Sequence, residues 1–180
     1  MRAVLCLKRH STIQRTVVLA PPEEIRKVTN QCAYDTFEWA LSQGHDKVAI
    51  SLVERDPAFV HGRYTRGITP LMKAVPTGRI PVIAALIQHG ASVNAADSGG
   101  STPLMAAACM ALFDVVRFLL EQPGLNIDAV DLDGMSALHW AVWAVQPDIV
   151  QLLLDKGANP LLLVQALLQR LGTSQDQSPP

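Results

Sequence analysis

One six-residue stretch occurs three times in this chain: Thr69-Pro70-Leu71-Met72-Lys73-Ala74, then Thr102-Pro103-Leu104-Met105-Ala106-Ala107, then Ser136-Ala137-Leu138-His139-Trp140-Ala141. The second copy begins 33 residues after the first, and the third begins 34 residues after the second. A fixed period of about 20 to 50 residues is the signature of a repeat architecture, so this spacing decides the fold before local structure is considered.

The rest of the unit recurs together with these stretches. A glycine stands two residues before each of them, and two apolar residues follow each one at matching offsets. The recurring residues are Gly67, Gly100 and Gly134, and the apolar pairs Val82 with Leu86, Val115 with Leu119, and Ile149 with Leu153. The repeating unit is therefore about 33 residues long rather than a short motif.

Each class of recurring residue has a physical role in a pair of helices. Thr followed by Pro is a helix start, because the hydroxyl accepts a hydrogen bond from an unpaired amide and Pro has no amide to leave unpaired. A second apolar segment follows, clearest at 114–120, and ends near a glycine, which accepts the left-handed closing conformation without strain. The stretches Asp97-Ser98-Gly99-Gly100 and Asp131-Leu132-Asp133-Gly134 predict hairpin loops between units.

These features together resemble the ankyrin repeat. Three units cover residues 64–160, and a weaker one precedes them, in which Phe37 matches Leu71, Ala40 matches Ala74 and Gly44-His45 fills the turn between the helices. The resemblance implies an all-α ankyrin-repeat solenoid of stacked helix-turn-helix units with short hairpin loops. The expected repeats are about 34–63, 64–96, 97–130 and 131–160, within a repeat domain at 31–160.

The chain departs from the family pattern at several places. The family histidine is present only at His139, because Met72 and Met105 replace it in the two preceding repeats. The bonds from imidazole to backbone that link neighbouring loops are therefore expected only at His139. Tyr64 stands where the other hairpins have aspartate, so an irregular first hairpin is expected.

The segments on either side of the repeats have distinct compositions. Residues 1–30 are read as a basic leader or flexible segment, and residues 1–22 carry four basic residues and no acid, as an organelle transit peptide does. A strand at 16–20 packed on the first repeat explains the same residues. Residues 161–171 predict a Leu-rich helix that caps the last repeat, or alternatively binds a partner, and 172–180 form a polar tail.

The composition is that of a folded interaction protein: 49% of the 180 residues are hydrophobic and 17% are charged. Three cysteines (Cys6, Cys32 and Cys109) include no Cys-x-x-Cys pair, which argues against a disulfide scaffold and a thiolate zinc site. We therefore expect a reducing compartment, cytoplasmic or nuclear, or mitochondrial if residues 1–22 are a transit peptide. No apolar run reaches the roughly 20 residues of a membrane span, so no membrane segment is expected.

Charge alternates along the chain. Residues 57–96 hold four bases and no acid, whereas residues 97–160 hold eight acids and two bases. Nucleic acid is not expected as a partner, because phosphate binding needs a continuous basic face and the aromatic residues Trp140, Trp143 and Phe113 lie in the acidic half. The basic stretch instead favours a partner with an acidic segment facing Arg63, Arg66 and Arg79.

No catalytic or metal-binding pattern is complete. The five histidines have no His-x-x-x-His spacing, and there is no Gly-rich phosphate loop. The turn at Asp131 and Asp133 resembles part of a calcium loop, but Trp140 occupies the position where that loop needs a bidentate glutamate. We therefore expect no enzyme activity, no cofactor and no metal.

Ankyrin-like proteins resemble one another in binding through their hairpin tips and first helices. The positions of this chain that correspond are Arg66, Ile68, Pro76, Ser101, Met110, Asp133, Met135 and Trp143. Ile68, Met110, Met135 and Trp143 are expected to form an apolar stripe, although burial of Trp143 against the 161–171 helix is an alternative, and Trp140 is expected to be structural. Asn94 resembles asparagines that a dioxygenase hydroxylates, with a hairpin-stabilising amide as the alternative.

The sequence as a whole predicts a non-catalytic module that binds another protein through the concave groove, as an adaptor or inhibitor. A monomer is expected. Two alternatives stay open: an organelle-imported ankyrin protein whose basic leader is cleaved, and a truncated product of a longer multi-domain ankyrin protein. The identity of the partner is not encoded in the repeat pattern, because a fold of this kind serves many functions.

Overall fold

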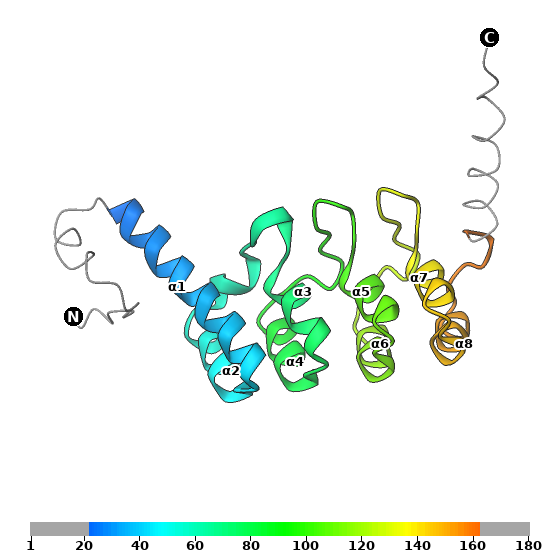
Figure 1. Cartoon of the computed structure of the whole chain (residues 1–180), viewed down its shortest axis with the longest axis horizontal. Coiled ribbons are helices and arrows are strands. Elements are labelled where there is room, and N and C mark those ends of the chain that lie inside the picture. The colour runs from blue at the N-terminus through cyan, green and yellow to red at the C-terminus, as the bar shows by residue number, and fades with distance from the viewer. Residues whose placement is uncertain (1–21, 163–180) are drawn as a thin grey trace, which may run out of the picture.

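A computed structural model describes the backbone of residues 22–162 and the side chains of residues 32–162. Helices in this part of the chain form a row of four pairs, as the repeat period predicts (Figure 1). The pairs are α1 (Pro22–Gln43) with α2 (Asp46–Arg55), α3 (Pro70–Ala74) with α4 (Ile80–Gln88), α5 (Pro103–Cys109) with α6 (Phe113–Leu120), and α7 (Ala137–Trp143) with α8 (Pro147–Asp155). Short 3₁₀ turns lie at η1 (Pro57–His61), η2 (Thr65–Gly67) and η3 (Val75–Thr77).

The first helix of each pair packs on the first helices of its neighbours, and second helices pack on second helices. First helices pack on first helices, α1 on α3, α3 on α5 and α5 on α7, while α2 packs on α4 and α6 on α8. One buried apolar cluster runs through all four pairs, and the three loops between pairs project to the same side of the row (Figure 1). No helix within residues 22–162 combines the length and the apolar character that a membrane crossing requires. The prediction of an all-α repeat solenoid is confirmed.

The first helices begin as the Thr-Pro pattern predicts. The hydroxyl of Thr69 accepts a hydrogen bond from the amide of Met72 at 3.3 Å, and Thr102 accepts one from Met105 at 3.4 Å. Each threonine thus pairs an amide that the first turn of a helix leaves open. The proline that follows each threonine occupies the first helical position, where no amide is needed.

The family histidine makes the link predicted for it. Nδ1 of His139 accepts a hydrogen bond from the amide of Ser136 at 3.0 Å, and Nε2 donates to the carbonyl of Leu162 at 3.1 Å. His139 therefore ties the start of α7 to the chain that follows α8. In the preceding repeat the sulfur of Met105 takes the place of Nδ1 and accepts from the amide of Thr102 at 3.4 Å.

Helix α1 differs from the prediction. The sequence predicts a boundary between leader and repeat domain at residue 30, but α1 continues through it from Pro22 to Gln43. After Pro22 no proline or glycine occurs before Gly44, so no residue in this stretch ends a helix. The expected start of the first repeat at residue 34 therefore lies inside a helix of 22 residues.

Apolar side chains are partly exposed at both ends of the described row of helices. Val48 of α2 is 39% exposed, whereas its counterpart Val82 of α4 is fully buried, because no repeat in the described residues covers the outer face of α2. At the other end Leu154 of α8 is 38% exposed. The predicted capping helix at 161–171 lies outside the described residues apart from Leu161 and Leu162. So do the predicted polar tail at 172–180, the predicted strand at 16–20 and residues 1–21 of the predicted leader at 1–30.

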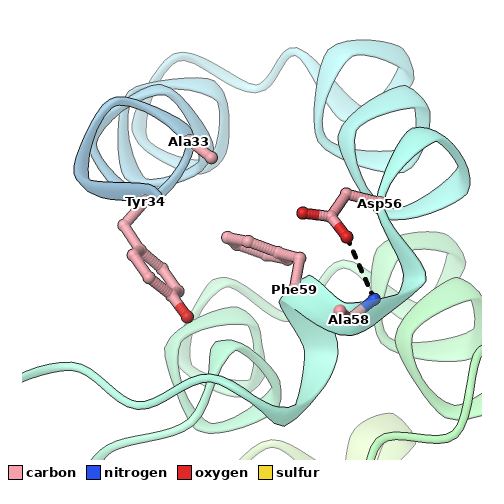
Figure 2. Close-up of a pocket in the computed structure, with 5 residues that line it drawn as sticks. All are labelled: Ala33, Tyr34, Asp56, Ala58 and Phe59. Carbon is pink, nitrogen blue, oxygen red and sulfur yellow. Dashed lines mark hydrogen bonds between the residues drawn. The ribbon is translucent and has the colours of Figure 1, made fainter. Parts of the chain in front are cut away.

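An aromatic cluster joins the first repeat to the first hairpin. The ring of Tyr34 lies 4.8 Å from that of Phe59 and 4.7 Å from that of Tyr64, and Phe37 lies 5.1 Å from Phe59. Figure 2 shows a small pocket beside this cluster, in which Asp56 accepts a hydrogen bond from the amide of Ala58 at 3.2 Å. Its volume of about 80 Å³ is far below the roughly 300 Å³ at which ligand pockets begin, so the pocket is a packing feature.

This cluster predicts a loss of stability at high pH. Burial, with the charge of Glu38 as a smaller cause, raises the pKa of Tyr64 well above the ordinary value of 10.0. The unfolded chain therefore releases the phenol proton at a lower pH than the folded chain. The contribution of the protonated Tyr64 phenol to the free energy of unfolding is therefore fully present below pH 10. It declines as the pH rises from 10 toward the raised pKa of Tyr64 in the folded chain.

The measurement is urea unfolding of the wild type and of Tyr64→Phe at steps from pH 8 to pH 11. The free energy of unfolding of the wild type should fall more steeply above pH 10 than that of the variant, with a difference near neutral pH below about 1 kcal/mol, since Tyr64 makes only a 3.4 Å hydrogen bond to the carbonyl of Tyr34. Parallel pH curves for the two proteins would contradict the assignment to Tyr64.

Candidate functional site

The second and third hairpins share one turn geometry, which an aspartate fixes. Oδ1 of Asp97 accepts hydrogen bonds from the amides of Gly99 at 2.8 Å and Ser101 at 2.9 Å. Oδ1 of Asp131 does the same with Asp133 at 3.0 Å and Met135 at 2.8 Å. Each carboxylate satisfies two backbone amides of its own turn, so the tip is held in one conformation.

The tips are also bonded to one another. The amide of Ser98 donates to the carbonyl of Arg66 at 2.8 Å, and the amide of Leu132 donates to the carbonyl of Gly99 at 3.0 Å. Nη1 of Arg63 adds bonds to the carbonyls of Gly67 at 2.7 Å and Ala96 at 2.8 Å. The three hairpins seen side by side in Figure 1 therefore form one connected edge.

The first hairpin is irregular, as Tyr64 in the aspartate position predicts. Its closing bond remains, since the amide of Tyr64 donates to the carbonyl of Ile68 at 2.7 Å. Arg66 at the tip has a φ of 63°, a left-handed conformation that non-glycine residues seldom adopt. Within residues 32–162 the Arg66 side chain is exposed and has no hydrogen bond or ion pair.

A second row of links joins the segments that follow the second helices. Nδ2 of Asn94 donates to the carbonyl of Gly124 at 2.7 Å, and Oδ1 of Asn94 accepts from the amide of Asn126 at 2.8 Å. One repeat later Asp128 accepts from the amide of Asn159 at 2.8 Å. Asn94 thus has the hairpin-stabilising contacts considered as the alternative to a modified residue, and its hydroxylation stays a prediction.

The turns that end the first helices need a left-handed residue in every repeat. Glycine supplies it at Gly44 and Gly78, with φ of 78° and 69°, but Ala111 and Val145 occupy the matching positions with φ of 58° and 56°. A β-branched residue is strained in this region. Val145 is nevertheless 79% exposed, so no burial among the described residues accounts for valine there.

The structure places the eight predicted binding residues as follows. Arg66, Pro76, Met110, Asp133 and Trp143 are exposed, while Ile68, Ser101 and Met135 are half-buried. The predicted apolar stripe divides into two rows: Ile68 and Met135 precede first helices, whereas Met110 and Trp143 end or follow them. One stripe was expected because linear spacing does not show that a first helix of seven residues, about 10 Å long, separates the rows.

The two tryptophans of α7 form a pair. Trp143 is 69% exposed among the described residues. The alternative, burial of Trp143 against the 161–171 helix, involves residues outside the described part of the chain and stays a prediction. Trp140 is half-buried; its Nε1 donates to Oδ2 of Asp131 at 3.0 Å, and its ring meets that of Trp143 edge-on at 5.8 Å. Trp140 therefore has the expected structural role and also belongs to the surface.

Trp39 of α1 is a further exposed aromatic residue, which the sequence pattern does not single out. It is 50% exposed and lies 5.0 Å from the ring of His45. The repeat alignment would have found it, because Trp39 occupies the same position of the unit as Lys73 and Trp140.

The predicted basic patch is not assembled as expected. Arg63 is bonded to the hairpin carbonyls, and Arg79 forms an ion pair with Asp46 at 2.9 Å. Lys73 pairs with Glu38 and lies 5.1 Å from the centre of the Tyr64 ring. Since Arg66 precedes α3 and Arg79 follows it, they sit at opposite ends of that helix, and only Arg66 of the predicted three is without an internal partner in the described residues.

The described residues include no cluster of side chains that could hold a metal ion. Between residues 32 and 162 no three side chains of histidine, cysteine, aspartate or glutamate are grouped to hold a metal ion. The Asp131 carboxylate is occupied by two backbone amides and the indole of Trp140.

Comparison with known proteins supports the repeat assignment. The family model described as "Ankyrin repeats (3 copies)" matches residues 37–131 and 100–163. The chain is 36% identical over 126 residues to the "Putative palmitoyltransferase ZDHHC13" of Danio rerio, over 68% of this chain and 19% of that protein. It is 33% identical to "Alpha-latrotoxin-Lg1a" of Latrodectus geometricus, over 66% of this chain and 9% of the toxin.

A third relative is the "Ankyrin repeat and SAM domain-containing protein 6" of Rattus norvegicus, which is 30% identical over 132 residues, or 67% of this chain and 15% of that protein. The chain spans less than a fifth of the length of each of these relatives. What the matches share with this chain is therefore confined to part of each relative.

Proposed function

The chain belongs to the ankyrin-repeat family, and from that premise we propose that it binds another protein through its hairpin tips and the exposed ends of its first helices, as an adaptor or inhibitor. Ankyrin repeats are protein–protein interaction modules, and the fold is typically non-catalytic. We propose accordingly that the chain acts by occupying a partner's surface rather than by a reaction of its own.

The observation that carries this proposal is the connected edge of hairpins. The tips are held by backbone bonds between neighbours, from Ser98 to Arg66 and from Leu132 to Gly99. Their side chains at Arg66, Leu132 and Asp133 stay exposed. A surface that is ordered before it binds loses less conformational entropy on association, which favours its use in recognition.

Exposed apolar residues support the same surface. Met110 and Trp143 are 48% and 69% exposed at the ends of neighbouring first helices. Tryptophan and methionine are enriched in interfaces, and large aromatic residues often carry much of the binding energy. Arg66 adds a positive charge at the first hairpin, which suits an acidic residue in the partner.

The test compares capture of partners from cell lysate by three forms of the chain. The first is the wild type, and the second is the variant Arg66→Glu, Met135→Glu, Trp143→Ala. The third is a matched control on second helices, Arg117→Glu, Gln151→Glu, Leu154→Ala, at positions that are also exposed. Circular dichroism and thermal melting must show that all three forms are folded.

Quantitative mass spectrometry measures the amount of captured partner. We expect this amount to fall at least tenfold for the variant Arg66→Glu, Met135→Glu, Trp143→Ala and to stay unchanged for the control. A loss of about 1.4 kcal/mol of binding free energy is enough for this, and a single anchoring residue commonly contributes 2 kcal/mol or more. Equal capture by all three forms would place binding elsewhere in the chain and overturn the proposed surface.

A further inference from the structure

The pair formed by Trp140 and Trp143 has the geometry of an aromatic corner. The two residues are three apart on α7, and their rings are nearly perpendicular, at 81° with centres 5.8 Å apart. Two rings at this angle present the negative face of one beside the edge of the other. A group resting in the corner would contact both side chains at once.

A carboxylate fixes one wall of this corner. Oδ2 of Asp131 accepts the hydrogen bond from Nε1 of Trp140, while Oδ1 holds the amide of Asp133. The same carboxylate therefore sets both the indole of Trp140 and the tip of the third hairpin. A negative charge is thus built into the site, and the exposed Asp133 adds a second on the same turn.

Among the described residues the cation that lies over an aromatic ring is Lys73 on Tyr64, and no lysine or arginine of this part of the chain lies over Trp140 or Trp143. In the N-terminal half, Lys73 forms an ion pair with Glu38 of the preceding repeat, and Arg79 forms one with Asp46 of the same preceding repeat. In the C-terminal half, residues 97–160 hold eight acids and only Arg117 and Lys156 as bases. Arg117 pairs with Asp114 at 3.1 Å on its own helix.

The first repeats contain an internal version of the same arrangement. Lys73 lies 5.1 Å from the centre of the Tyr64 ring and pairs with the carboxylate of Glu38. Lys73 and Trp140 occupy equivalent positions of the repeat. In the first two repeats the chain itself supplies ring, carboxylate and lysine, whereas among the described residues the repeat of α7 supplies only the rings and the carboxylate.

We propose that Trp140 and Trp143, with Asp131 and Asp133, form a binding site for a cationic side chain of the partner protein. The attraction is a cation–π interaction between the positive charge and the face of an indole ring. Among aromatic side chains, tryptophan binds cations most strongly in this way. The carboxylates add charge complementarity. This inference rests on the proposed function and specifies the chemistry of one contact within it: a lysine or arginine in a basic segment.

The chain allows a direct test, because it contains three tryptophans. The indole N–H signals of ¹⁵N-labelled full-length protein are assigned with Trp39→Leu, Trp140→Leu and Trp143→Leu. Tetramethylammonium is then titrated, with tert-butanol as an uncharged probe of similar shape and with ionic strength held constant by sodium chloride. Exposed Trp39 beside His45 is the matched internal control.

We expect the signals of Trp140 and Trp143 to shift and saturate with tetramethylammonium, at least fivefold more tightly than with tert-butanol, while Trp39 shifts little. Asp133→Asn should weaken this binding at least twofold, and Trp143→Leu should abolish the shift at Trp140. Equal binding of both probes would show an apolar site and overturn the proposal. So would equal shifts at Trp39 and Trp143.

Short peptides that differ only in a central lysine, trimethyllysine or arginine then identify which cation fits best. The outcome is separable from that of the proposed function. If tetramethylammonium fails to bind but the partner is still lost in the variant Arg66→Glu, Met135→Glu, Trp143→Ala of the capture experiment, the interaction surface stands and the cationic contact is wrong. If both fail, the surface itself is wrong.

Discussion

Replacing Leu104 with alanine is expected to lower the free energy of unfolding by about 3 kcal/mol, within the range of fully buried leucines. Leu104 lies on α5 with only 1% of its surface exposed. Helix α5 packs on α3 on one side and α7 on the other, so the side chain belongs to the interfaces of a central repeat. The substitution therefore removes contacts that couple the two halves of the row.

Urea unfolding followed by circular dichroism measures this change. Leu132→Ala is the matched control, because the side chain of Leu132 is 80% exposed at a hairpin tip and its loss should change stability by less than about 0.5 kcal/mol. A second, separate unfolding transition for Leu104→Ala would show that the weakened repeat uncouples its neighbours. A loss below 1 kcal/mol would contradict the packing described here.

Replacing Gly100 with alanine is expected to destabilise the chain by about 2 to 3 kcal/mol through strain and steric overlap. Gly100 has a φ of 79°, and a Cβ at this position would lie 3.0 Å from both the Cα of Asp131 and the amide nitrogen of Leu132. Those atoms are backbone of the next hairpin, so they cannot turn away as a side chain would. The hairpins would have to separate and lose the bond from Leu132 to Gly99.

Gly124→Ala separates the two causes. Gly124 has a similar φ of 74°, but a Cβ there would meet nothing within 4 Å. It should therefore show the conformational cost alone, about 1 kcal/mol. The excess loss in Gly100→Ala then measures the contact between hairpins. Equal losses for the two variants would mean that the tips are not in contact in solution.

Much of the fold could be predicted because the signals are local. The caps at Thr69 and Thr102 act within three residues of the chain, and the period shows where each copy of the unit falls. The start of α1 could not be read in this way. The first repeat has no Thr-Pro signal, and nothing between Pro22 and Gly44 ends the helix.

The candidate site was predicted only in part. The sequence identified Met110 and Trp143, which the structure exposes, but it expected them to join Ile68 and Met135 in one stripe. It treated Trp140 as structural only and missed Trp39. Exposure depends on which neighbours cover a side chain, and the spacing within one repeat does not record that.

The repeat, its length and the threonine–proline starts of α3 and α5 follow from the sequence, because these depend on bonds between residues three or four apart. The tertiary structure alone decided which charges remain for a partner. Arg79 finds Asp46 33 residues earlier, Arg63 finds the carbonyl of Ala96 33 residues later, and Asp131 holds Trp140 nine residues away. The contacts of Arg79 and Arg63 follow from the stacking of neighbouring repeats, and the contact of Asp131 joins the third hairpin to α7 within one repeat.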